Sequence, residues 1–333
     1  MSKKQWLDKH ILWVYVPVVF AFSWTFWLGS GALGQDQWAP VYDMSWFWAQ
    51  IGVFGPALWA LVFVAVLRPE KRRQSFALLG LFVAVTFLMR RVAARAGGGA
   101  LDLSSSLQIA VMIVATAVIL TFVFLRRPLE TEDRAIPARK KAGWLLVSIL
   151  LFPALFLAGW SIFHTGSGAS VNLLRYGWAA AVVHFFLFFA FNLLYGGSLG
   201  EELGWRGLML PRLLKTNNPA GAAVILGLIW GLWHMPVDLA HGFGLPGAGG
   251  VMVRVFWGVV LSVVFTWIYI RSGRGLLAAL LMHTALNFLP DLGFSNYELA
   301  GGILFILTFF TAVAVVAIDP KMREELSARN RKI

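Results

Sequence analysis

Two adjacent carboxylates and an arginine stand out because apolar and aromatic residues flank them on both sides. Glu201, Glu202 and Arg206 lie in the segment GEELGWRG, residues 200–207. A carboxylate in an apolar pocket can act as a general base that takes a proton from water. A charge near the bilayer centre costs about 2.5–3.5 kcal/mol on insertion scales, and charges kept there usually have a function. We therefore expect a functional site at this cluster.

Two later segments supply imidazole and amide groups that fit the same chemistry. His234 ends the segment WGLWH, and His283 and Asn287 begin and end the segment HTALN. His234 could share a proton with Glu201 or orient a water molecule. His283 and Asn287 lie on one face of a predicted helix and could donate hydrogen bonds to a developing oxyanion. A base, a water and oxyanion donors together favour hydrolysis of a peptide bond.

A metal version of this site is also possible. Glu201, His234 and His283 are candidate zinc ligands that would leave one coordination position open. The chain has no cysteine, which excludes disulfides, thiolate catalysis and cysteine-bound zinc. It also has no His-Glu-x-x-His pair. The spacing leaves both mechanisms open, so the predicted cofactor is either none or zinc.

The composition is typical of a polytopic membrane protein. Of the 333 residues, 59% are hydrophobic and 13% are charged, and the mean hydropathy is +0.73. The net charge of +12 comes from basic residues clustered in short loops beside apolar segments, where topology signals lie. The expected partners are therefore the lipid bilayer and a peptide or protein substrate in or at the membrane, and not a nucleic acid.

A membrane-crossing helix needs about 20 mostly apolar residues, which predicts an all-α transmembrane bundle of about 8–10 membrane helices. The predicted spans are 11–30, 46–67, 75–90, 107–126, 143–163, 177–212, 219–236, 250–270, 275–290 and 299–318. The sixth span is too long for one straight crossing. Gly196, Gly197 and Gly200 predict a kink or break within it.

Lysine and arginine residues set the predicted orientation of the bundle. They precede the first span and follow alternate spans, whereas loops 34–44, 237–249 and 291–298 contain none. The positive-inside rule then puts both termini in the cytoplasm. Arg90 and Arg91 break this pattern, and we interpret them as part of a short interfacial helix. Short loops and missing eukaryotic targeting signals favour a multi-pass protein of a prokaryotic cell membrane.

The segment 127–141 contains prolines and charges and is the most linker-like part of the chain. We predict N-terminal membrane helices in 1–141, with about four spans. A C-terminal membrane core follows in 142–320, and a charged cytoplasmic tail in 321–333.

Helical geometry places the candidate residues at similar depth. We expect a hairpin at 216–219 that joins two antiparallel spans. With a rise of 1.5 Å per residue, Glu201 lies about 16 Å before the end of the first span and His234 about 22 Å into the next. The same rise puts His283 and Asn287 about 12 and 18 Å along their span. These side chains therefore fall within one layer of the membrane.

The two glutamates point in different directions. Glu202 and Arg206 are i, i+4 and can pair on one helix face. Glu201 lies about 100° further round the helix and can face another partner. We therefore expect Glu202 to be structural and Glu201 to be available for chemistry.

Three motifs occur in order along the chain: Glu201-Glu202-x-x-x-Arg206, Trp230-x-x-x-His234 and His283-x-x-x-Asn287. Together they resemble the CPBP family, which comprises CAAX proteases and bacteriocin-processing enzymes that are intramembrane endopeptidases. The resemblance covers about residues 180–290. It implies that Glu201 and His234 activate water and that His283 and Asn287 hold the oxyanion.

The resemblance also implies the class of enzyme and substrate. It implies a CAAX-protease-like endopeptidase, of glutamate or metallo type, that acts on prenylated or hydrophobic membrane-associated peptides. One departure is visible, because many members have phenylalanine where this chain has Trp230.

Two other classes of protein could use the same residues. A transporter or proton-linked channel also places glutamate, histidine and arginine at mid-depth. A non-catalytic protein with an immunity or chaperone-like role could keep the fold without the reaction.

Several further residues have structural explanations at this stage. We interpret Trp205, Trp230 and Trp233 as packing or pocket-wall residues, and Asp238 as a solvated residue of an outer loop. The segment GGSLG around Ser198 matches the Gly-x-Ser-x-Gly elbow of hydrolases. That elbow requires a strand–turn–helix setting, and here the segment interrupts a membrane helix, so we assign no nucleophile there.

Overall fold

The described part of the chain consists of helices joined by short turns. A computed structural model describes residues 2–30, 44–95, 114–115, 117–119, 129, 135–163, 185–186, 189–190, 192–194, 197–241, 247–289 and 297–324. No strand occurs in these ranges, and the predicted all-α bundle is confirmed. The predicted span 107–126 and the first part of span 177–212 lie mostly outside the described residues.

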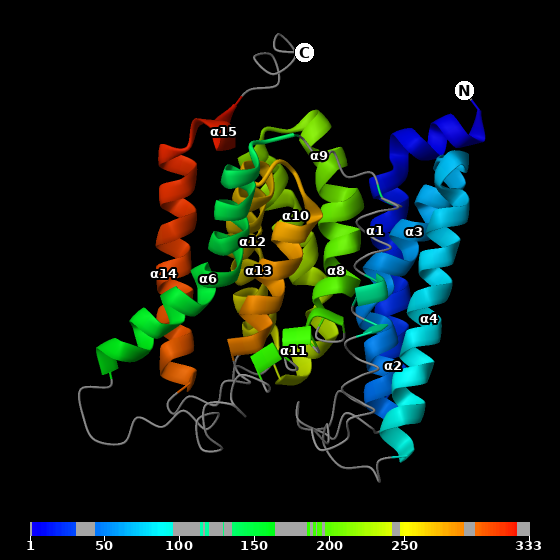
Figure 1. Cartoon of the computed structure of the whole chain (residues 1–333), viewed down its shortest axis with the longest axis horizontal. Helices are drawn as coiled ribbons and strands as arrows, with labels where there is room; N and C mark the ends of the chain where they lie inside the picture. The colour runs from blue at the N-terminus through cyan, green and yellow to red at the C-terminus, as the bar shows by residue number, and fades with distance from the viewer. Residues whose placement is uncertain are drawn as a thin grey trace.

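The helices form a bundle with the motif-bearing segments near its centre (Figure 1). In chain order they are α1 (Lys3–Gly29), α2 (Met44–Val53), α3 (Gly55–Leu67), α4 (Arg72–Arg95), α6 (Ala138–Phe163), α8 (Ser198–Gly204), α9 (Leu210–Thr216), α10 (Pro219–Trp233), α11 (Met235–His241), α12 (Ala248–Arg271), α13 (Leu276–Phe288), α14 (Tyr297–Ile318) and α15 (Pro320–Arg323). Helices α1, α3 and α4 lie on one side and α6 and α14 on the other. Between them, α10 packs along α12, and α8 packs against both α3 and α13.

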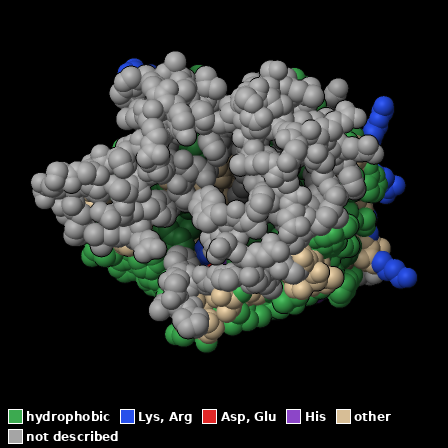
Figure 2. All heavy atoms as spheres, turned by 90° about the horizontal axis from the view of Figure 1, so that it is seen from below, with side chains coloured by type: hydrophobic (Ala, Val, Ile, Leu, Met, Phe, Trp, Pro, Cys, Tyr) green, Lys and Arg blue, Asp and Glu red, His purple; other side chains and the backbone are tan. Residues whose placement is uncertain are grey.

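Several of these helices are suited to a lipid environment. Those long and apolar enough to cross a membrane, among the described residues, are Lys3–Gly29, Ala138–Ser161, Ala248–Arg271 and Ala300–Ile318. Trp13 and Ile318 are 83% and 76% exposed, which lipid tails tolerate because they are as apolar as these side chains. Seen from the end opposite α15, the described perimeter is mostly hydrophobic (Figure 2). The chain is a multi-pass membrane protein.

The predicted hairpin between the sixth and seventh spans is present. Helix α9 ends at Thr216, and α10 begins at Pro219. The side chain of Asn218 caps α10 by accepting a hydrogen bond from the N–H of Gly221 at 2.7 Å. An asparagine before a proline in the first turn is a favourable helix start. Helices α9 and α10 therefore form the antiparallel pair on which the predicted similar depth of Glu201 and His234 depends.

The third predicted span differs from the structure. Helix α4 runs without interruption through Arg90 and Arg91, so the prediction of a separate interfacial helix is wrong. Its 24 residues extend about 36 Å, which exceeds the roughly 30 Å of a bilayer's hydrocarbon core. The physical reason is that a continuous helix keeps its backbone groups hydrogen-bonded, whereas a break before Arg90 would leave some of them without partners.

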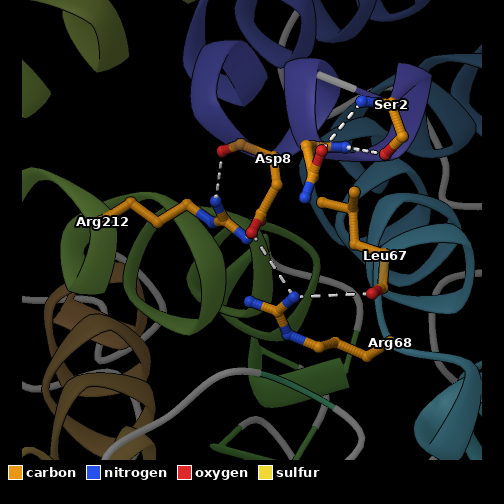
Figure 3. A network of polar contacts seen from close by, with 6 residues as sticks. Ser2, Asp8, Leu67, Arg68 and Arg212 are labelled. Carbon is orange, nitrogen blue, oxygen red and sulfur yellow. Dashed lines mark hydrogen bonds and ion pairs between the residues drawn. The ribbon is translucent and has the colours of Figure 1, made fainter.

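An ion-pair network ties α1 to α3 and α9 at the end of the bundle where α1 begins (Figure 3). Asp8 of α1 accepts hydrogen bonds from Arg212 of α9, through its side chain at 2.8 Å and its main-chain carbonyl at 3.0 Å. Arg68, directly after α3, lies 3.5 Å from the second carboxylate oxygen of Asp8. Helix α15 lies at the same end, as expected if both termini face one side of the membrane.

A second polar contact fixes the end of α14. The side chain of Asp319 accepts hydrogen bonds from Arg271 at 2.6 Å and from Trp267 at 2.9 Å, both on α12. Its other oxygen accepts the main-chain N–H of Lys321 at 3.0 Å and caps α15. Burial alone would raise the pKa of Asp319, but these hydrogen bonds outweigh burial and lower the pKa below its usual value. The ionised carboxylate therefore stabilises the packing of α12 against α14.

We expect Asp319→Asn to lower the thermal unfolding midpoint of the purified protein near neutral pH, and the difference from wild type to shrink in acid. The folded-state pKa of Asp319 lies below the unfolded value. Its contribution is therefore fully present above the unfolded pKa of about 3.9 and is lost as the pH falls through the folded pKa. Thermal unfolding in detergent across this range measures it. Substitution of the exposed Glu70 by Gln is the control, and a difference that stays constant into acid would contradict the expectation.

Candidate active site

The segment that carries the two glutamates begins at a break in the backbone. Gly197 precedes α8 with a φ of +96°, a conformation that residues with a Cβ rarely adopt. A Cβ at this position would also lie 2.7 Å from Oε1 of Glu201. The predicted break in the long sixth span is therefore confirmed at Gly197, and the missing side chain leaves room for the Glu201 carboxylate.

A π-helical segment follows the glutamates and joins α8 to α9. It covers Trp205–Met209, and the N–H of Trp205 reaches the carbonyls of both Glu201 and Glu202. Such segments add one residue to a helical turn and are frequent at functional sites. Residue spacing alone gave no sign of this segment, because the sequence reads as a regular helix there.

Glu202 is the centre of a fully buried polar network. Its Oε1 accepts a hydrogen bond from Nη1 of Arg206 at 2.8 Å and lies 2.8 Å from Nδ1 of His283. Glu202 and Arg206 are 0% exposed and His283 is 3% exposed. The predicted i, i+4 pair is confirmed. The link to His283 was not predicted, and it joins α8 to α13.

The guanidinium of Arg206 lies between two aromatic rings. Its central carbon is 4.8 Å from the ring centre of Trp230 and 4.5 Å from that of Phe265. The ring faces attract a cation, and this attraction is stronger where water is excluded. Nε and Nη2 of Arg206 are buried and have no hydrogen-bond partner in the part of the chain that the structure describes, so the aromatic faces and Glu202 together offset the burial of this charge.

Glu201 faces α10 rather than Arg206. The indole Nε1 of Trp230 donates a hydrogen bond to Oε2 of Glu201 at 2.5 Å, and Glu201 is 5% exposed. His234 follows Trp230 by one helical turn, and its Nδ1 lies 2.8 Å from the main-chain carbonyl oxygen of Trp230. The two residues expected to activate water are therefore joined through Trp230. The interpretation of Trp230 as a packing or pocket-wall residue misses this hydrogen bond.

The second histidine completes the cluster from α13. The rings of His283 and Trp230 are 5.6 Å apart between centres, and the rings of His234 and Trp230 are 6.0 Å apart. Asn287 is half-buried one turn beyond His283, on the same helix face. The three motifs thus meet around Trp230, as the depth argument predicted.

Two other expectations have a clear outcome. Ser198 is fully buried, and among the described residues its hydroxyl has no hydrogen-bond partner that could activate it as a nucleophile. Asp238 is not a solvated loop residue: it lies in α11, is 1% exposed, and its Oδ1 and Oδ2 accept from Nε of Arg254 at 3.0 and 3.1 Å. The prediction is wrong because the partner of this carboxylate, Arg254, lies on another helix, α12, and sequence spacing does not reveal the contact.

In the described part of the chain, the candidate zinc ligands Glu201, His234 and His283 do not form a metal-binding group. Within the described ranges, no group of three or more His, Asp or Glu side chains could hold one. Nδ1 of His283 and Nδ1 of His234 contact Glu202 and the carbonyl of Trp230, so only Nε2 of each ring is left for another ligand. The guanidinium of Arg206 in the same cluster would repel a cation. We therefore derive no step through a metal.

Comparison with known proteins bears on this region. Residues 182–289 match a family described as Type II CAAX prenyl endopeptidase Rce1-like. The chain is also similar to CAAX prenyl protease 2 of Methanococcus maripaludis, with 23% identity over 184 residues, which is 53% of this chain and 66% of the relative. The resemblance to CAAX proteases inferred from the three motifs is confirmed, and the matched segment contains every predicted site residue.

We expect Gly197→Ala to damage the site. The new methyl group would require a strained backbone and would lie against the carboxylate of Glu201, so a destabilisation of about 1–3 kcal/mol is expected. Thermal unfolding of the purified variant measures this. Gly143→Ala is the matched control, because a Cβ there meets nothing within 4 Å and alanine favours a helix. Equal unfolding midpoints for the two variants would show that Gly197 is not constrained in this way.

Proposed function

We propose that this chain is an intramembrane endopeptidase of the CAAX-protease type, in which Glu201 activates the attacking water. The observation that carries the proposal is the meeting of Glu201, His234 and His283 around Trp230 in the bundle interior. Ionisable groups from three helices at one buried position are costly to maintain without a function.

Water activation is assigned to Glu201 and His234. The carbonyl of Trp230 can only accept a hydrogen bond, so Nδ1 of His234 carries the proton in this contact. In a neutral ring, Nε2 then presents a lone pair that can accept a hydrogen bond from water. Glu201 takes the proton as the water oxygen attacks the carbonyl carbon of the substrate. It returns that proton to the leaving nitrogen as the C–N bond breaks.

Oxyanion stabilisation is assigned to His283 and Asn287. Nδ1 of His283 faces the carboxylate of Glu202 and donates to it. Nε2 is then the ring nitrogen left for the substrate, and it donates to an oxyanion when it also carries a proton. The amide of Asn287 adds a second donor one turn away. Fixed donors of this kind contribute strongly in a site that excludes bulk water.

The substrate is a peptide or protein held in or at the membrane. The similar archaeal protein is named for a prenylated CAAX substrate, and we extend that class to this chain as part of the proposal. A hydrophobic or prenylated segment would partition into the bilayer beside the apolar helices and reach the site from there. The location proposed is a prokaryotic plasma membrane.

We expect Glu201→Gln and His234→Ala to lower the rate of cleavage of a fluorogenic membrane peptide by about 10²–10⁴-fold, the range typical of a lost general acid–base group. Purified full-length protein in detergent or proteoliposomes is used, and peptide cleavage is followed by fluorescence. Ser198→Ala is the control and keeps the activity, because the proposal gives this hydroxyl no role. Unchanged cleavage by both site variants would refute the proposal.

Metal analysis of the active preparation accompanies this test. Cleavage that persists with no stoichiometric metal and in the presence of a chelator supports activation by the carboxylate. Stoichiometric zinc together with loss of activity on chelation would contradict that part of the mechanism. Proteoliposome flux without peptide cleavage would instead favour a transporter.

A further inference from the structure

We propose that Trp230 is a positioning residue whose indole N–H and main-chain carbonyl together set the geometry between Glu201 and His234. The inference rests on the proposed function and extends it to a residue that acts through Glu201 and His234. It predicts that the indole nitrogen, and not only the aromatic bulk, is needed for turnover.

The indole contact orients the carboxylate. The side chain of Trp230 has one donor, Nε1, and this donor bonds to Oε2 of Glu201. The bond fixes the rotation of the carboxylate about its last torsion, which is otherwise broad. Oε1 lies on the other side, against Gly197. The carboxylate of Glu201 is therefore held in one orientation. A base held in one orientation is more effective than one that rotates.

The main-chain contact orients the imidazole. A carbonyl in a regular helix accepts from the N–H four residues later. Helix α10 ends at Trp233, and the N–H of His234 turns to the carbonyls of Gly231 and Leu232. The carbonyl of Trp230 is therefore available to the His234 side chain, and this contact satisfies one of the terminal carbonyls of the helix. The four-residue spacing from Trp230 to His234 follows from this geometry.

The surroundings make the indole contact rigid. Trp230 is 4% exposed, and its ring lies against the guanidinium of Arg206 and the ring of Phe265. A phenylalanine would keep an aromatic face for Arg206 and would leave the main-chain contact to His234 unchanged. It would lack the N–H. The change Trp230→Phe therefore separates the hydrogen bond from the other functions of the residue.

The matched control lies three residues away. Trp233 is 0% exposed on the same helix, and its buried Nε1 has no hydrogen-bond partner within the ranges that the structure describes. Trp233→Phe therefore removes an indole N–H with no described partner, at a similar cost in packing. The comparison of the two variants isolates the contribution of the bond to Glu201.

The experiment measures kcat and KM of the full chain for a fluorogenic membrane peptide. For Trp230→Phe we expect kcat to fall about 10–100-fold with KM changed by less than about threefold, as expected for a lost hydrogen bond to a charged group. For Trp233→Phe we expect kcat within about threefold of wild type. A kcat for Trp230→Phe equal to that of Trp233→Phe would overturn the inference.

A second variant covers the case in which Trp230→Phe does not fold. Incorporation of benzothienylalanine at position 230 replaces the N–H by sulfur and keeps the shape of the indole. We expect this protein to have the same low kcat, and full activity would show that only shape matters. If Glu201→Gln is inactive while benzothienylalanine at 230 is harmless, only this inference fails. If Glu201→Gln is active, the proposed function fails instead.

A readout without proteolysis tests the bond itself. Thermal unfolding midpoints are compared for Trp230→Phe, Glu201→Leu and the double variant. We expect the double variant to be less destabilised than the sum of the single variants, because either change alone removes the same bond. Strictly additive shifts would overturn the inference whether or not the chain is a protease.

Discussion

The structure depends on how one buried carboxylate is neutralised. An unpaired carboxylate in an apolar interior is so costly that it would take up a proton or move to water. Glu202 avoids this because Arg206 and His283 both meet the same oxygen. Removal of one partner from such a buried pair typically costs about 3–5 kcal/mol. One partner lies on the same helical segment and the other on α13, so charge neutralisation also fixes the depth and rotation of α13 relative to α8.

This constraint determines what the neighbouring glutamate can do. Successive residues on a helix point about 100° apart. Once Glu202 faces Arg206 and α13, Glu201 must face elsewhere, and it meets Trp230 of α10. The same ring also covers the guanidinium of Arg206. Trp230 therefore connects the buried ion pair to the group proposed to activate water, and the two adjacent glutamates have separate tasks in one small volume.

Features that depend on local spacing could be predicted from the sequence. The pair Glu202–Arg206 follows from i, i+4 geometry, and the break at Gly197 follows from glycine in a segment too long for one span. The hairpin at Asn218 was expected from the sequence, and it predicted that Glu201 and His234 lie at similar depth. Each of these needs only the chain near the residue in question, together with the length of a membrane crossing.

Features that depend on contacts between distant segments could not be predicted. The bond from Trp230 to Glu201 joins residues 29 positions apart, and it requires knowledge of how α10 is rotated against α8. The ion pair of Asp238 with Arg254 depends on α11 folding back against α12. The π-helical turn after Glu202 changes the phase of the helix without any residue type that marks it. The division of the chain at 141 and the roles of the site residues stay predictions.

The most direct measurement is a structure of the Glu201→Gln variant in a lipid nanodisc with an uncleaved membrane peptide bound. The account predicts that the scissile carbonyl lies inside the bundle, with its carbon beside the side chain of residue 201 and Nε2 of His234 and its oxygen within hydrogen-bonding distance of His283. A peptide bound elsewhere, or a metal ion coordinated between residue 201 and the histidines, would contradict it.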